Sequence, residues 1–260
     1  MAQSPRARQV LLDYSQQRVD ADAVMRALIE HEDWHVPVHA LTRNVVDQLV
    51  IYAQQFQLAP HQLNVFTDRA AADLAAVKFG GEPMGVYAAG ISGAELFGGL
   101  LKVPALEPAQ TLQVNPGTPT AEQWFVARDA FGLCGVWSQA VSLERAIAGS
   151  TPGWAEAMRA YPAWLAIIGK ADNALVRINK PGKGEHALIF TAPDLADHFL
   201  KGLPAAQAAA CQASPVPGDQ LFKFLSASTV KGFVVNANST QARVFDVSVC
   251  RAILGLPGQG

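Results

Sequence analysis

The residues with the clearest chemical potential are His31-Glu32-Asp33-Trp34-His35, which have the spacing H-E-x-x-H. In zinc proteases this spacing places two histidine ligands on one face of a helix, and the glutamate activates the water bound to zinc. His39 is available as a third ligand. A zinc-dependent hydrolase that uses His31, Glu32 and His35 is therefore one open alternative for the function.

The elements expected around this segment argue against a metal site. Apolar and polar residues alternate from Trp34 to His39, which is typical of a strand, and Pro37 favours an edge position because it cannot donate to a ladder. The two histidines of the motif would then not share a helix face. The matching segment later in the chain, Ala160–Trp164, contains no histidine. We expect no metal and no cofactor.

Other catalytic patterns are missing from the sequence. There is no G-x-S-x-G elbow, no G-x-G-x-x-G loop and no Walker pattern, and we interpret the glycines as ends of helices and turns. The cysteines, Cys134, Cys211 and Cys250, lie far apart and form no C-x-x-C pair. That usage favours buried thiols in a reducing compartment over a disulfide framework.

Charge and hydropathy limit the class of partner. The chain has 260 residues, with 20 basic and 22 acidic side chains and a net charge of −2. No basic surface is available to neutralise phosphates, so we expect no nucleic acid as partner. The apolar runs are short and the first ten residues contain no apolar core of a signal peptide, so we expect no membrane segment and a cytoplasmic location.

The strongest signal of organisation is an internal repeat. Three short patterns recur in the same order at offsets of 124, 125 and 121 residues: Phe66-Thr67 and Phe190-Thr191, Gly93-x-Glu95-Leu96-Phe97 and Gly218-x-Gln220-Leu221-Phe222, Val114-Asn115 and Val235-Asn236. The repeat predicts an N-terminal leader or helix over residues 1–21, a first copy over 22–150 and a second copy over 151–260.

Strands and helices are expected to alternate within each copy. Helical periodicity or caps predict helices over 23–30, 42–57, 69–78, 92–101, 140–148, 194–201, 219–226 and 249–254. Short apolar runs predict strands over 63–67, 85–89, 111–114, 123–127, 165–168, 175–178, 187–190, 208–214, 232–235 and 242–247. Strands joined by helices pair in parallel through right-handed crossovers. We therefore predict an α/β protein (mixed α+β) with two tandem copies of a small mixed, largely parallel sheet and flanking helices.

Polar residues at the ends of these strands are the best candidates for a binding surface. They are Thr67, Asp68, Asn115 and Asn236. Ligands of open sheets gather outside the carboxyl ends of parallel strands, which gives these residues a shared location. The alternative interpretation is that they only cap helices and form turns.

The repeated motifs resemble the SseB family of bacterial "enhanced serine sensitivity" proteins. The resemblance is carried by Val65-Phe66-Thr67-Asp68, the helix with Glu95-Leu96-Phe97, and Val114-Asn115-Pro116-Gly117, and it covers about residues 22–255. In the second copy Ala192 replaces Asp68, and Asn236-Ala237-Asn238 replaces the turn. The resemblance implies tandem SseB domains in the bacterial cytosol and brings no catalytic residues. It also hints at an adaptor role near secretion systems.

Besides the hydrolase, two further classes of function are open alternatives. The first, which we favour, is a non-enzymatic SseB-like protein that binds another protein, because the structural motifs are duplicated in the sequence and the polar chemistry is not. The second is a small-molecule sensor with a site between the two copies. The sequence leaves the oligomeric state open.

Overall fold

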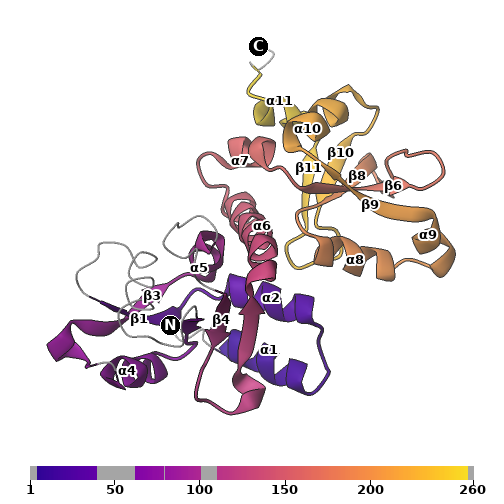
Figure 1. The fold of residues 1–260 in the computed structure, drawn as a ribbon. Coiled ribbons are helices and arrows are strands. Elements are labelled where there is room, and N and C mark those ends of the chain that lie inside the picture. The colour runs from indigo at the N-terminus through magenta and orange to yellow at the C-terminus, as the bar shows by residue number, and fades with distance from the viewer. Residues whose placement is uncertain (1–4, 40–61, 79, 101–109, 257–260) are drawn as a thin grey trace. The chain divides into compact units, whose positions relative to one another are not determined.

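The computed structural model describes residues 5–39, 62–78, 80–100 and 110–256 (Figure 1). The chain is a mixed α/β protein that divides into two compact units, Met1–Val141 (unit 1) and Ser142–Gly260 (unit 2). The division falls inside helix α6 (Phe131–Gly149). The boundary expected from the repeat, after residue 150, follows the end of the same helix.

Unit 1 combines helices with short strands. The helices are α1 (Pro5–Ser15), α2 (Ala21–Glu30), α4 (Arg69–Lys78) and α5 (Gly93–Gly99), with 3-10 turns η1 (Glu82–Met84), η3 (Thr120–Glu122) and η4 (Arg128–Ala130). The strands are β1 (Trp34–His39), β2 (Gln62–Val65), β3 (Val86–Ile91), β4 (Thr111–Val114) and β5 (Trp124–Ala127). Asp20 is the N-cap of α2, and its carboxylate accepts from the Ala23 amide at 2.9 Å. Ser92 and Glu95 form a capping box at the start of α5.

The strands of unit 1 connect across one isolated bridge. β1 pairs antiparallel with β3, β2 pairs parallel with β4, and β4 pairs antiparallel with β5. His35 and Phe66 exchange two backbone hydrogen bonds of 2.8 and 2.9 Å, which join β1 to the end of β2. The spatial order is therefore β3-β1-β2-β4-β5.

Pro37 fits this arrangement because of the side to which its nitrogen points. The His35 amide donates toward β2, and strand geometry with a period of two turns the nitrogen of Pro37 to the same side. The bridge to Phe66 is made at His35, so no backbone hydrogen bond of this bridge requires an N–H group at position 37. The predicted edge position holds at Pro37, because β1 forms a two-stranded sheet with β3 and its bridge to Phe66 is made at His35 alone.

Unit 2 contains helices α7 (Trp154–Ala160), α8 (Pro193–Lys201), α9 (Ala205–Ala210), α10 (Gly218–Ala227) and α11 (Val249–Ile253) besides the end of α6. Its strands are β6 (Trp164–Gly169), β7 (Arg177–Lys180), β8 (Gly184–Phe190), β9 (Cys211–Val216), β10 (Gly232–Val235) and β11 (Arg243–Asp246). They form one sheet in the order β11-β10-β8-β6-β9, with β7 paired to β8. The predicted strand over 208–214 is wrong in its first part, because α9 occupies Ala208 to Ala210.

The prediction of a largely parallel sheet is wrong. β2–β4 and β8–β10 are parallel, and the remaining pairs of named strands are antiparallel. In unit 2, β8, β9 and β10 do run in one direction, as helical crossovers require. The sheet is mixed because β6 runs the other way and lies between β8 and β9. In unit 1, β1 lies in the same way between β2 and β3.

Helices cover both faces of each sheet. In unit 1 the large apolar cluster contains residues of α1, α2, α5 and α6 and lies on one face of the strands. A smaller cluster is formed by Ala72 of α4 with Phe66 and Ala88. In unit 2, α8 packs on β6, β8 and β9, with Leu188, Phe190 and Phe199 in the cluster between them. The helix expected over 42–57 lies outside the described residues. No helix in the described part of the chain is long and apolar enough to cross a bilayer.

Thiol reactivity should follow burial. Desolvation raises the pKa of Cys134 and of Cys250 to about 12, so neither forms appreciable thiolate near neutral pH. Cys211, at the start of β9, is only half-buried. We expect iodoacetamide to label Cys211 first in the native protein and all three thiols in urea, measured by peptide mass spectrometry. Equal labelling rates in the native state would contradict this assignment.

Candidate functional site

The predicted strand-end residues of unit 1 form a hydrogen-bonded bracket. The Asn115 side-chain oxygen accepts from the Thr67 amide at 2.9 Å and lies 3.1 Å from the Thr67 hydroxyl. Its Nδ2 donates to the Glu122 carbonyl at 3.0 Å. Asn115 has a left-handed backbone, with φ of 51°, a conformation that asparagine tolerates better than most residues. This bracket joins the end of β2 to the end of β4.

The remaining predicted residue, Asn236, forms a bracket of the same kind in unit 2. Its Oδ1 accepts from the Thr191 amide at 2.9 Å, and its φ is 52°. The Thr191 hydroxyl donates to the Glu144 carboxyl group, and Asn236 Nδ2 lies 3.3 Å from the same carboxyl oxygen. Sequence reasoning missed Thr191 and Glu144 as members of this group. No clear signal was available in the sequence, because Glu144 stands next to Arg145 in an ordinary mixed helical stretch from Val141 to Ile147.

These contacts place the predicted residues in two separate groups. Thr67, Asn115 and Asn236 are buried, and their side-chain oxygens already have partners inside their own unit. Asp68 is exposed and caps α4 by accepting from the Ala71 amide at 3.0 Å. The geometry is that of capping and turn formation, which was the alternative interpretation of these residues.

The histidine segment leaves the helix before its second histidine. His31 is the C-cap of α2 and His35 lies on β1, so the prediction that they do not share a helix face is confirmed. The His31 Nε2 donates to the Asp33 carbonyl at 3.0 Å, and its ring meets Trp34 edge-on. The His35 Nε2 lies 3.4 Å from the Asp33 carboxylate. Among the described residues no group of three or more His, Cys, Asp or Glu side chains could hold a metal ion.

Acid sensitivity should depend on His31. Burial is the largest influence on this group and lowers its pKa below the ordinary value of about 6.5. The unfolded chain therefore takes up the proton first, so the stability that is present above about pH 6.5 falls as the pH drops below it. We expect His31→Asn to flatten the pH dependence of the unfolding free energy there by up to about 1.4 kcal/mol per pH unit. Urea titrations across this range would measure it, and an unchanged slope would contradict it.

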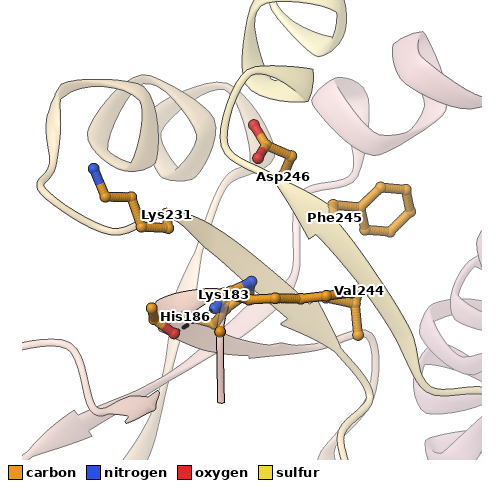
Figure 2. Close-up of a pocket in the computed structure, with 8 residues that line it drawn as sticks. Lys183, His186, Lys231, Val244, Phe245 and Asp246 are labelled. Carbon is orange, nitrogen blue, oxygen red and sulfur yellow. Dashed lines mark hydrogen bonds between the residues drawn. The ribbon is translucent and has the colours of Figure 1, made fainter. Parts of the chain in front are cut away.

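A cavity of about 640 Å³ lies on the sheet of unit 2 (Figure 2). Sequence reasoning did not find it. It is lined by Gly182, Lys183, Gly184, His186, Lys231, Val244, Phe245 and Asp246. These residues come from the turn between β7 and β8, from β8, and from the ends of β10 and β11. The size is within the range of pockets that bind small molecules.

Strand register explains why these residues meet. Gly232 pairs with His186 of β8 on one side and with Asp246 of β11 on the other. A side chain on Gly232 would have its Cβ only 2.7 Å from the His186 ring, so glycine is what allows the ring to lie over this position. Since side chains in register on adjacent strands project from the same face, His186 and Asp246 border one hollow. The position of Lys231 also depends on a neighbouring glycine, because a Cβ on Gly184 would lie 2.9 Å from Lys231 Cγ.

The cavity carries charges of both signs. Lys183, Lys231 and Asp246 are exposed, and the ring of His186 is buried. The Asp246 carboxylate accepts from the Ser248 amide at 2.8 Å. Hydrogen bonding from Ser248 is the largest influence that lowers the pKa of Asp246, and the charges of His186 and Lys231 act in the same direction. Asp246 is therefore an ionised acceptor near neutral pH.

The described residues thus offer one open cavity with convergent polar groups, together with two buried brackets that are internally satisfied. Any functional assignment has to rest on these features and on the surface. Comparison of the chain with protein-family models, with curated proteins and with solved structures found no match.

Proposed function

We propose that the chain is a non-enzymatic bacterial protein of the SseB type, built from two copies of one domain, which binds another protein in the cytoplasm. Its role would be that of an adaptor, for example one accessory to a secretion system. The observation that carries the binding role is an exposed apolar surface on unit 1. The experiment that tests it is affinity capture with matched surface variants.

Matching internal contacts support the proposal of two copies. Trp34 Nε1 donates to the Leu28 carbonyl at 2.9 Å, and Trp164 Nε1 donates to the Met158 carbonyl at the same distance. The amides that start α5 and α10 each donate to a residue that ends α2 or α7, Gly93 to His31 and Gly218 to Tyr161. The two threonine–asparagine brackets share their geometry. The strand order β3-β1-β2-β4-β5 in unit 1 corresponds to β9-β6-β8-β10-β11 in unit 2.

The apolar surface on unit 1, here called the α4 surface, consists of Leu74, Val77 and Met84. Their exposed fractions are 67%, 67% and 57%. Leu74 and Val77 are three residues apart on α4, so they lie on one side of the helix. Val77 and Met84 both flank the turn at Gly80 and Gly81, where a Cβ on Gly81 would be 3.8 Å from Val77 Cγ2.

The position of α4 explains why these side chains are not part of the core. The helix turns Ala72 and Ala76 toward the sheet, where both are buried, and small residues let it lie close to β1 and β3. Leu74 and Val77 project from another side and contribute nothing to that packing. Large apolar side chains that lie together on an exposed surface are typical of sites that bind other proteins.

The test is capture of partners from a native bacterial lysate with the tagged full-length protein. The variant Leu74→Gln with Val77→Gln removes the apolar contacts and keeps good helix formers in α4. We expect the proteins recovered by the wild type to be lost or reduced about tenfold with this variant, because a few apolar anchors carry most of the binding free energy.

The matched control is Phe224→Gln on α10 of unit 2. Phe224 is 55% exposed, so the change removes one exposed apolar side chain, similar in exposure to each of the two on α4, from the other unit. The control should recover the same proteins as the wild type. Recovery of nothing above background, or of an identical set with the α4 variant, would overturn the proposal.

A further inference from the structure

We propose that the cavity of unit 2 binds a small phosphate ester that also carries hydroxyl groups. The inference does not depend on the protein-binding role, because it concerns a different unit and a different chemistry. Four observations carry it: two ammonium groups without ion-pair partners, a buried imidazole with one free nitrogen, a carboxylate at the rim, and the volume between them.

The two lysines supply the positive charge. In the described part of the chain neither Lys183 nor Lys231 has a carboxylate within ion-pair distance, although both line the cavity. They come from different segments, the turn before β8 and the residue before β10. The stem of Lys231 lies against Gly184, which limits its freedom before any ligand arrives. A phosphate monoester carries about −1.5 to −2 charges near neutral pH, which two ammonium groups can balance.

His186 supplies a hydrogen-bonding group with a defined role. Its Nδ1 lies 3.0 Å from the Gly184 carbonyl, and because a carbonyl only accepts, Nδ1 must carry the proton. In the neutral ring Nε2 is therefore an acceptor. No partner for Nε2 exists within the described residues, although the side chain is only 3% exposed. His186 lines the cavity, so a ligand hydroxyl can donate to this nitrogen.

Asp246 determines which part of the ligand lies at the rim. Its carboxylate repels a phosphate and accepts hydrogen bonds from hydroxyl groups. In Figure 2 Lys231 and Asp246 project from neighbouring strand ends. The hydroxyl-bearing part of the ligand would contact Asp246 and His186, and the phosphate would contact the two lysines. Neither a bare anion nor a neutral polyol uses all four groups.

The test is calorimetric titration of the full-length protein with three probes: glucose 6-phosphate, inorganic phosphate and glucose. We expect saturable binding of glucose 6-phosphate, about tenfold weaker binding of inorganic phosphate, and no measurable binding of glucose. Lys183→Gln and Lys231→Gln should each weaken glucose 6-phosphate about tenfold, the loss typical of one charge-assisted hydrogen bond. Both lysines are exposed, so these changes should leave the fold intact.

Asp246→Asn is expected to change the affinities for the two anions in opposite directions. Removing the negative charge should strengthen inorganic phosphate, whereas the loss of the hydroxyl acceptor should weaken glucose 6-phosphate. The control is Lys223→Gln, an exposed lysine on α10 of the same unit that does not line the cavity and should change neither affinity. Absence of saturable binding of glucose 6-phosphate, equal affinity for phosphate, or insensitivity to both lysine changes would overturn the proposal.

Discussion

Asn236→Ala is expected to lower the unfolding free energy by about 3 kcal/mol. The change removes the acceptor for the Thr191 amide and the donor to Glu144, and all three residues are buried. Their polar groups would remain inside the protein without replacement water, which costs more than the hydrogen bonds themselves. Alanine also tolerates the φ of 52° poorly. Urea unfolding followed by circular dichroism measures the loss.

Two further variants separate the contributions. Asn236→Gly keeps the left-handed backbone and removes the side chain, so it should still lose most of the stability. Asn238→Ala is the control for the backbone alone, because Asn238 has a φ of 61° but is exposed. It should cost only about 1 kcal/mol. If Asn236→Ala cost no more than Asn238→Ala, the bracket would contribute nothing to stability.

Gly218→Ala should be equally damaging for a steric reason. A Cβ at this position would lie 2.5 Å from the Arg159 carbonyl oxygen and closer still to that of Met158. Both are backbone atoms at the end of α7, and the Gly218 amide is held to the Tyr161 carbonyl at 2.9 Å, so neither side can move cheaply. We expect a loss of about 3 kcal/mol or more, measured by urea unfolding, with the start of α10 displaced from α7.

Gly182→Ala is the matched control for Gly218→Ala. Gly182 has a φ of 72° and nothing within 4 Å of an added Cβ, so only backbone strain of about 1 kcal/mol is expected. Gly93→Ala in unit 1 should repeat the large effect, since its Cβ would lie 2.5 Å from the carbonyl oxygens of Leu28 and Ile29. A loss at Gly218 no larger than that at Gly182 would show that the close approach of the helices is not required.

Local features of the fold were predictable because local chemistry determines them. Asp20, the pair Ser92 and Glu95, and Pro193 start helices through interactions within one turn, and the structure has helices there. Strand order was not predictable in this way. The insertion of β6 between β8 and β9 is decided by packing between segments distant in sequence, whereas the pattern of helices and strands only indicates direction.

The candidate sites show the same limit. Thr67, Asn115 and Asn236 were identified from their places at strand ends, but Thr67 meets Asn115 across 48 residues of sequence and Asn236 meets Glu144 across 92. The cavity depends on Gly232 lying in register between His186 and Asp246. A glycine at the start of a strand gives no sign of its neighbours, so a site of this kind becomes visible only in three dimensions.

Helix α6 places a constraint on how the protein can be dissected. The helix carries Phe131 and Trp137 into the core of unit 1 and, two turns later, Glu144 into the bracket of unit 2. A fragment that starts at residue 151, where the repeat predicts the start of a domain, would lack Glu144. Thr191 and Asn236 would then be left without their carboxyl partner. Autonomous folding of the C-terminal half thus requires a start upstream of Glu144, inside a helix rather than in a linker.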